Sequence, residues 1–186
     1  MKNRKLYAAL LTGTLAVTMM GTTVFASAGQ TGTTQFTYEG GTIQPPGTGE
    51  ANDWMVKYPT SVKLADSNKA ENVATSKTAG VPMAFSVTKK DGTTAVSNTN
   101  IGAGLKITAS ATNWTDTNIA MGGRSGEVVN MRLTSTADAF LRNNGEMATL
   151  TVGAPNATGY ASLSGDSKPV SGRNYTQTVT WTVTKK

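Results

Sequence analysis

Histidine and cysteine are both absent from this chain of 186 residues. Without them the sequence offers no cysteine nucleophile, no Ser-His-Asp triad, no histidine-bearing metal site and no disulfide. Its 11 acidic residues stand mostly apart, in polar stretches beside Gly, Asn or Ser, so no carboxylate pair for glycoside hydrolysis is indicated. The sequence therefore predicts a protein that is not an enzyme and that needs no cofactor.

Metal-binding and crosslinking patterns are also weak. Asp116 lies between Asn113 and Asn118, which suggests calcium, but the stretch lacks the alternating ligands and closing Glu of an EF-hand. Residues 122–126 are Gly-rich without the Lys-Ser/Thr end of a phosphate loop, so they predict a turn. No metal site is predicted. A Lys–Asn isopeptide bond, which needs a buried Lys, Asn and carboxylate in contact, stays open.

Long apolar runs are scarce as well, apart from one near the N-terminus. Three basic residues among the first five precede the apolar residues 6–17, and Ala26, Ser27 and Ala28 follow. This order is typical of a secretory signal peptide cleaved after Ala28, with a membrane anchor as the alternative. No later segment approaches the ~18 consecutive apolar residues of a membrane helix. We therefore predict a secreted, extracellular protein without a membrane span in its mature form.

The net positive charge is smaller than the whole sequence suggests. Loss of residues 1–28 would remove three cations and no acid, which lowers the net charge from +6 to +3. The paired cations Lys89-Lys90 and Lys185-Lys186 have no flanking aromatic residues on which bases could stack. The sequence thus predicts no nucleic-acid partner, and at most a mild attraction to an anionic wall or membrane surface.

The abundance of threonine points to strands, because a β-branched side chain suits a pleated surface with one wet face. The clearest pattern covers residues 175–184, where every second residue is threonine. Successive side chains of a strand point to opposite faces. We therefore expect Val179, Trp181 and Val183 to enter the core and the threonines to face water.

Several other segments show strand patterns separated by turn residues. Asn144-Gly145 is the best candidate for a hairpin turn, and residues 137–142 are the one helical candidate. Together these patterns predict an all-β, antiparallel β-sandwich, Ig-like or jelly-roll-like, with about eight or nine strands. The further strands are expected at residues 33–38, 54–58, 61–64, 83–88, 105–111, 127–134, 146–152 and 160–163.

The mature chain divides into two parts. Residues 29–53 hold an N-terminal strand followed by a Pro/Gly-rich linker at residues 43–53, and residues 54–186 form the sandwich domain. The N-terminal strand has Thr34, Phe36 and Tyr38 on one side. Either it folds back onto its own sheet, or it is donated to a neighbouring copy and builds a fibre by β-augmentation.

Four features together resemble a known family. They are the early segment TTQFTYEGG before Pro45-Pro46, an aromatic-led strand that reaches Pro59, the segment ITASATNWTD ending beyond Trp114, and the closing NYTQTVTWTVTKK. This pattern loosely resembles the WxL-type cell-surface proteins of Gram-positive bacteria, over most of residues 33–186. At the defining tripeptide the chain has Trp181-Thr182-Val183, with Val where the family has Leu.

The resemblance implies non-covalent attachment to the cell wall, with Trp motifs contributing to peptidoglycan binding. The candidate contact residues are then Trp181, Trp114 and Trp54. A tryptophan on an alternating strand is more often a core residue, whereas Trp54, after a polar linker, is expected to be half exposed. Peptidoglycan or another wall glycan is the expected partner, with copies of itself or other surface proteins as alternatives. A fibre subunit and a secreted glycan-binding adhesin remain the alternative functions.

Overall fold

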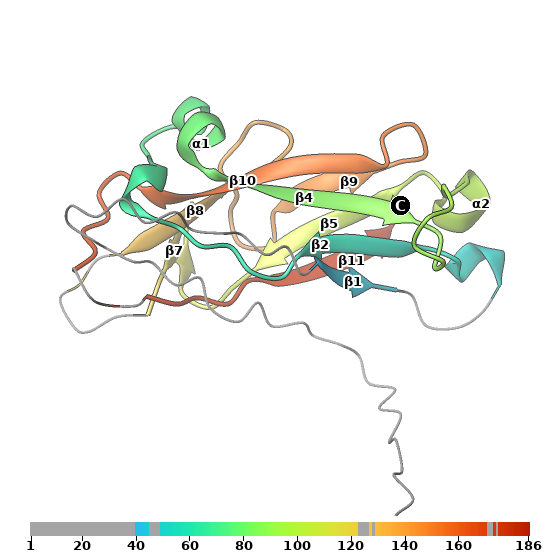
Figure 1. Cartoon of the computed structure of the whole chain (residues 1–186), viewed down its shortest axis with the longest axis horizontal. Coiled ribbons are helices and arrows are strands. Elements are labelled where there is room, and N and C mark those ends of the chain that lie inside the picture. Colours follow the sequence, from blue (N-terminus) through green and yellow to red (C-terminus); the bar gives the residue numbers. More distant parts are fainter. Residues whose placement is uncertain (1–39, 45–48, 123–126, 128, 171–172, 174) are drawn as a thin grey trace, which may run out of the picture.

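The protein is an all-β sandwich, as the sequence predicts (Figure 1). A computed structural model describes residues 40–44, 49–122, 127, 129–170, 173 and 175–186. The predicted signal peptide and the predicted strand at residues 33–38, with Thr34, Phe36 and Tyr38, lie outside the described residues. The larger sheet has the order β1-β2-β4-β10-β8-β7-β6, with β3 beside β10, and the smaller one has the order β11-β5-β9.

All strand pairs are antiparallel except β3 with β10, which is parallel. The larger sheet comprises β1 (Gly40–Ile43), β2 (Met55–Pro59), β3 (Lys69–Ala70), β4 (Val81–Thr88), β6 (Trp114–Thr115), β7 (Asn118–Ala120), β8 (Asn130–Thr134) and β10 (Asn156–Ser164). The smaller sheet comprises β5 (Leu105–Ser110), β9 (Glu146–Leu150) and β11 (Thr180–Lys185). Short helices connect them: η1 (Glu50–Asn52), η2 (Asp66–Asn68), α1 (Val73–Ala79) and α2 (Asn98–Ile101).

The core lies between the two sheets and follows from the alternation in their strands. In β5, and in β4 from Met83 onward, every second side chain is buried, which confirms the two-residue period seen in the sequence. The two layers meet where Phe85 of β4 and Trp181 of β11 pack edge to face, with ring centroids 5.1 Å apart and planes at 76°. The apolar residues of the alternating strands therefore form the contact between the two sheets.

The last strand is shorter than predicted because the chain changes sheets before it. Thr176 forms an isolated bridge with Gly122, next to β7 of the larger sheet, and β11 of the smaller sheet begins only at Thr180. Tyr175 and Val179 are nonetheless buried, as the alternation predicts. The Tyr175 hydroxyl accepts a hydrogen bond from the Val170 backbone N–H at 3.0 Å, which anchors this crossing.

The helical prediction for residues 137–142 is wrong. Asp138 has a φ of 57°, in the left-handed region that ends helices, and Phe140 bridges back to Thr134 of β8. The two α-helices lie elsewhere and carry no apolar periodicity in the sequence. In α1, the Asn72 side chain caps the first turn by accepting a hydrogen bond from the Thr75 N–H at 2.9 Å.

The hairpin prediction at Asn144-Gly145 is also wrong. Asn144 has a φ of 63°, but Gly145 does not adopt the positive φ that a type I′ hairpin turn needs at both central residues. The strands on either side, β8 and β9, belong to different sheets, so they do not pair with each other. The turn instead carries the chain from one layer of the sandwich to the other.

The sandwich begins before the predicted domain boundary at Trp54. Strand β1 pairs with β2, with Gly40 opposite Pro59 and Ile43 opposite Val56, and it forms one edge of the larger sheet. The predicted linker at residues 43–53 therefore starts inside a strand and contains the 3-10 helix η1. Residues 61–64 form no strand, although Val62 and Leu64 are buried.

Candidate functional site

All three tryptophans lie in the core. Trp54 is 5%, Trp114 9% and Trp181 6% exposed. The expectation that Trp54 is half exposed is wrong, because Trp54 shares the inward parity of Val56 and Tyr58, which continue from it along β2. A sugar can stack only on an exposed ring face, so in this structure none of the three indoles offers one.

Among the described residues, three buried polar atoms have no hydrogen-bond partner: Trp114 Nε1, Tyr58 OH and Thr88 Oγ1. Burial raises the pKa of Tyr58, so its phenol stays neutral at physiological pH. An enclosed water is the usual partner for such groups. These atoms are dispersed over strands β2, β4 and β6 and do not define a shared site.

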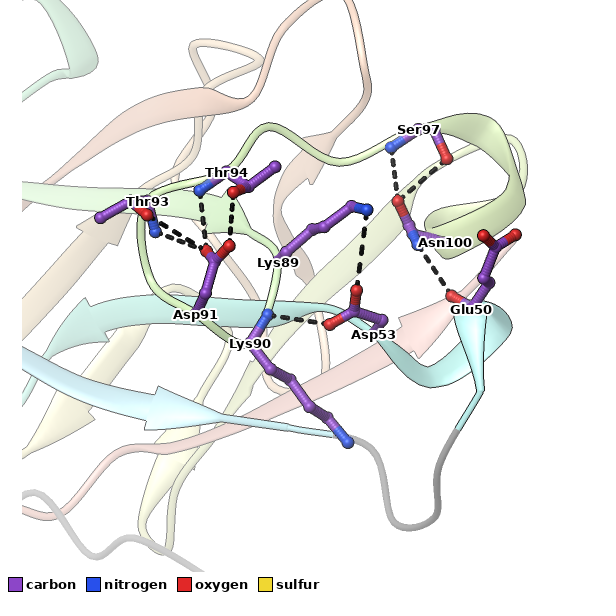
Figure 2. Close-up of polar contacts among 9 residues, drawn as sticks. All are labelled: Glu50, Asp53, Lys89, Lys90, Asp91, Thr93, Thr94, Ser97 and Asn100. Atoms are coloured by element: carbon purple, nitrogen blue, oxygen red, sulfur yellow. Dashed lines mark hydrogen bonds and ion pairs between the residues drawn. The ribbon is translucent and has the colours of Figure 1, made fainter.

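Polar side chains gather at the end of the sandwich that carries η1, α2 and the loop after β4 (Figure 2). In that loop the Asp91 carboxylate accepts hydrogen bonds from the Thr93 and Thr94 backbone N–H groups, both at 2.8 Å, and from the Thr94 hydroxyl. These hydrogen bonds, above all the one from the Thr94 hydroxyl, lower the pKa of Asp91 to about 2. Asp91 therefore closes a turn and is not poised as an acid or base near neutral pH.

This arrangement predicts how stability depends on acid. A carboxyl whose pKa is lowered in the folded state stabilises the fold above its unfolded pKa, and this contribution is lost as the pH falls through about 2, the folded pKa of Asp91. In Asp91→Asn, urea unfolding midpoints measured between pH 5 and pH 2 should therefore fall less steeply than in the wild type. Thr94→Val, which removes only the hydroxyl donor, should show an intermediate slope; identical slopes for all three proteins would contradict this role.

The remaining polar residues at this end tie segments together. The buried Asn100 accepts hydrogen bonds from the Ser97 N–H at 2.7 Å and the Ser97 hydroxyl at 2.9 Å, and its amide donates to the Glu50 carbonyl at 2.8 Å. Asp53 accepts from the Lys90 N–H at 3.2 Å and faces Lys89 Nζ at 3.8 Å (Figure 2). The carboxylates of Asp53 and Asp91 already have partners, and the described acids do not converge, so the cluster acts as scaffold.

No metal site emerges from the residues that the structure describes, since no three acidic side chains come together there. The calcium hypothesis placed Asp116 beside Asn113 and Asn118. Asp116 instead forms an ion pair with Arg142 at 3.0 Å, and the Asn118 side-chain oxygen accepts from Arg132 Nε at 2.7 Å. Oxygens held by cations are poor calcium ligands.

The isopeptide hypothesis finds no suitable lysine in the same ranges, where every lysine is exposed or half-buried. Lys185 Nζ comes nearest, because it donates to the Asn100 backbone carbonyl at 3.0 Å. Its other partner is the Ala51 carbonyl at 3.4 Å. These are backbone oxygens and not the carboxamide carbon that would react, so Lys185 serves to fasten the C-terminal strand to η1 and α2.

A buried hydroxyl cluster lies under α1, and no sequence pattern indicates it. Ser76 of α1 donates to the Ser162 hydroxyl at 3.1 Å, and Thr134 donates to the Ser76 hydroxyl at 2.8 Å. All three side chains have no exposed surface. Their mutual hydrogen bonds satisfy groups that would be costly to bury alone, and they anchor α1 on the outer face of β8 and β10.

The outer face of the smaller sheet is lined with hydroxyl groups. Thr182 and Thr184 are exposed, and the others on the face are half-buried. We call this surface the hydroxyl face; it comprises Thr108, Ser110, Thr149, Thr180, Thr182 and Thr184. Thr182 and Thr184 of β11 face water as expected, whereas Thr180 and Val183, which was expected in the core, are both half-buried.

Comparisons with protein-family models, with curated proteins and with solved structures find no match. The resemblance to WxL-type proteins therefore stays a prediction. No helix in the described part of the chain is long and apolar enough to cross a membrane. The function has to be argued from the surfaces of the sandwich itself.

Proposed function

We propose that the protein is exported and attaches non-covalently to the bacterial cell wall, as a structural or binding protein of the cell surface. One observation carries this proposal: the surface that the structure describes is polar. Its exposed large apolar side chains are Val152 and Val170, each 42% exposed. A surface without an apolar patch suits a hydrated partner such as a glycan better than an apolar protein groove or a lipid.

Charge and the predicted export support the same proposal. The signal-peptide pattern delivers the chain outside the cell, and its loss leaves a net charge of +3. A modest positive charge favours association with the carboxylates of wall polymers, while other contacts supply most of the binding free energy. The attraction should weaken as the salt concentration increases, because the distance over which charges interact falls, to about 8 Å at physiological ionic strength.

Sedimentation with purified peptidoglycan tests the proposal. We expect the protein recovered from the culture medium to begin at Gly29 by intact mass, and to pellet with peptidoglycan more completely at low than at high salt. Soluble wall fragments, added as competitor, should return it to the supernatant. Protein that stays in the supernatant at every salt concentration would refute wall attachment.

A second candidate function is a fibre subunit that donates its N-terminal strand. The supporting observation is that β1 is an edge strand, paired with β2, and residues 33–38 come directly before it in the sequence. A sheet edge can be extended by an added strand, so a β-prone sequence next to β1 is suited to β-augmentation of a neighbour.

Deletion of residues 29–39, which leaves β1 intact, tests this second candidate. Electron microscopy and size-exclusion chromatography should show filaments for the whole exported protein and monomers for the deletion variant. A monodisperse monomer of the undeleted protein at high concentration would rule out assembly of this kind.

A further inference from the structure

We propose that the hydroxyl face of the smaller sheet is the surface that binds the wall polymer, and that it takes an extended, carboxylate-bearing glycan strand. This inference rests on the proposed function. The tryptophan rings are buried and cannot contact the polymer. In this proposal the contact is made by the hydroxyl groups on β5, β9 and β11.

The strand register lines the hydroxyl groups up in rows. Thr180 lies opposite Ser110, and Thr182 lies opposite Thr108. Directly opposite residues of an antiparallel pair share one face of the sheet. The alternate residues Trp181 and Ile107 are 6% and 0% exposed, so they occupy the inner face and leave the outer one to the hydroxyls. A third row places Thr184, Lys106 and Thr149 side by side across all three strands.

These hydroxyl groups are available to a ligand. Within the described residues, the only one of them with a side-chain partner is Thr149, which donates to the Glu146 carboxylate. Each free hydroxyl can donate one hydrogen bond and accept others, as can the hydroxyl groups of a sugar. A polar polymer laid along the face could therefore exchange water for direct hydrogen bonds at several points.

The array is also largely fixed before binding. Threonine is stiff at χ1, so little side-chain entropy is lost when its hydroxyl is engaged. Side chains on one face of a strand repeat about every 6.6–6.8 Å, and neighbouring strands lie about 4.7–4.9 Å apart. Several weak contacts at regular spacing add up along a repeating polymer, which a compact ligand could not exploit.

The outer face of the larger sheet is a poorer candidate because other elements cover it. Helix α1 buries Ser162 and Thr134 there. At the other end of that sheet Met55 is only 6% exposed, and the Gly92 carbonyl of the loop after β4 accepts from the Lys57 amine at 3.1 Å. Among the described residues, the paired hydroxyl groups without a side-chain partner lie on the smaller sheet, where Thr180 is opposite Ser110 and Thr182 is opposite Thr108.

Charge indicates which glycan fits. Lys106 stands within the hydroxyl face, opposite Thr184, and Lys186 follows at the end of β11. Lys185 has the opposite parity, and its amine donates to the Asn100 carbonyl, so it is not counted with this face. The one acid on the face, Glu146, faces Lys186 Nζ at 3.8 Å and accepts from Thr149. The surplus is positive, so a glycan carrying carboxylates is favoured over a neutral one.

Isosteric valine substitutions test the proposal against purified peptidoglycan. The triple variant Thr108→Val, Thr182→Val and Thr184→Val removes three hydroxyls and keeps β-branched residues in the strands. We expect its dissociation constant in the sedimentation assay to rise about tenfold or more, since each lost hydrogen bond weakens binding a few-fold. The matched control, Thr158→Val, changes an exposed threonine of β10 on the other sheet and should bind as the wild type does.

The outcomes separate this inference from the proposed function. If the wild type pellets and the triple variant pellets equally well, the hydroxyl face is not the contact, while wall attachment stands. If the wild type itself stays in solution, both ideas fail. Circular dichroism checks folding, and the triple serine variant at the same positions, which keeps all three hydroxyls, should restore most of the binding. Should the triple valine variant unfold, Thr182→Val and Thr184→Val measured singly decide the question, because both side chains are exposed.

Discussion

Replacing Trp181 by alanine is expected to lower the free energy of unfolding by about 3–5 kcal/mol. The indole is 6% exposed, packs edge to face on Phe85 and joins the smaller sheet to the larger one. Truncation would remove its transfer free energy and leave a cavity that the rigid sheets fill only in part. Urea unfolding followed by circular dichroism measures this change directly.

Two comparisons show whether Trp181 acts through the core or through a ligand. Thr182→Ala, which changes the exposed next residue, should alter the free energy of unfolding by less than about 0.5 kcal/mol. Peptidoglycan binding per folded molecule should be the same in Trp181→Ala and the wild type. A stable Trp181→Ala protein that no longer binds the wall would overturn this view and make the indole a contact residue.

Much of the sandwich could be predicted because its information is local. Strand β5 alternates apolar and polar residues, and the two-residue period of β4 and β5 survives in their burial. What could not be predicted depends on partners far away in the sequence. Helix α1 is held by the hydrogen bonds of Ser76 with Thr134 and Ser162. These partners are far away in the sequence, so no pattern around residue 76 predicts them.

The candidate site shows the same division. The alternation correctly put Trp181 inside and the threonines outside, and the same parity, read from Val56 and Tyr58, would have put Trp54 inside as well. The polar linker before Trp54 suggested exposure, but the packing of β2 determined its position. The hydroxyl face needed the register of β5 against both β9 and β11, which the sequence does not encode locally.

Close packing between the sheets predicts a second large effect, at Gly159 in the middle of β10. A Cβ atom built there would lie 2.5 Å from Met147 Sδ of the opposite sheet and 2.8 Å from the Thr134 carbonyl oxygen. Valine favours strands over glycine by no more than about 1 kcal/mol. Overpacking costs about 1–3 kcal/mol and more where backbone must move. We therefore expect Gly159→Val to lower the free energy of unfolding, as measured by urea denaturation.

A double-mutant cycle identifies the cause. Met147→Ala alone should cost about 2–5 kcal/mol, because Met147 is fully buried. Combined with Gly159→Val, it removes the sulfur that the valine would strike, so the double variant should lose less stability than the two single losses added together, by about 0.5–3 kcal/mol. The relief should be partial, since the Thr134 carbonyl belongs to the backbone of β8 and cannot be trimmed. If the two losses of stability simply added, Met147 would not interact with a side chain at position 159. The cost of Gly159→Val would then come from its contact with the backbone of β8 alone.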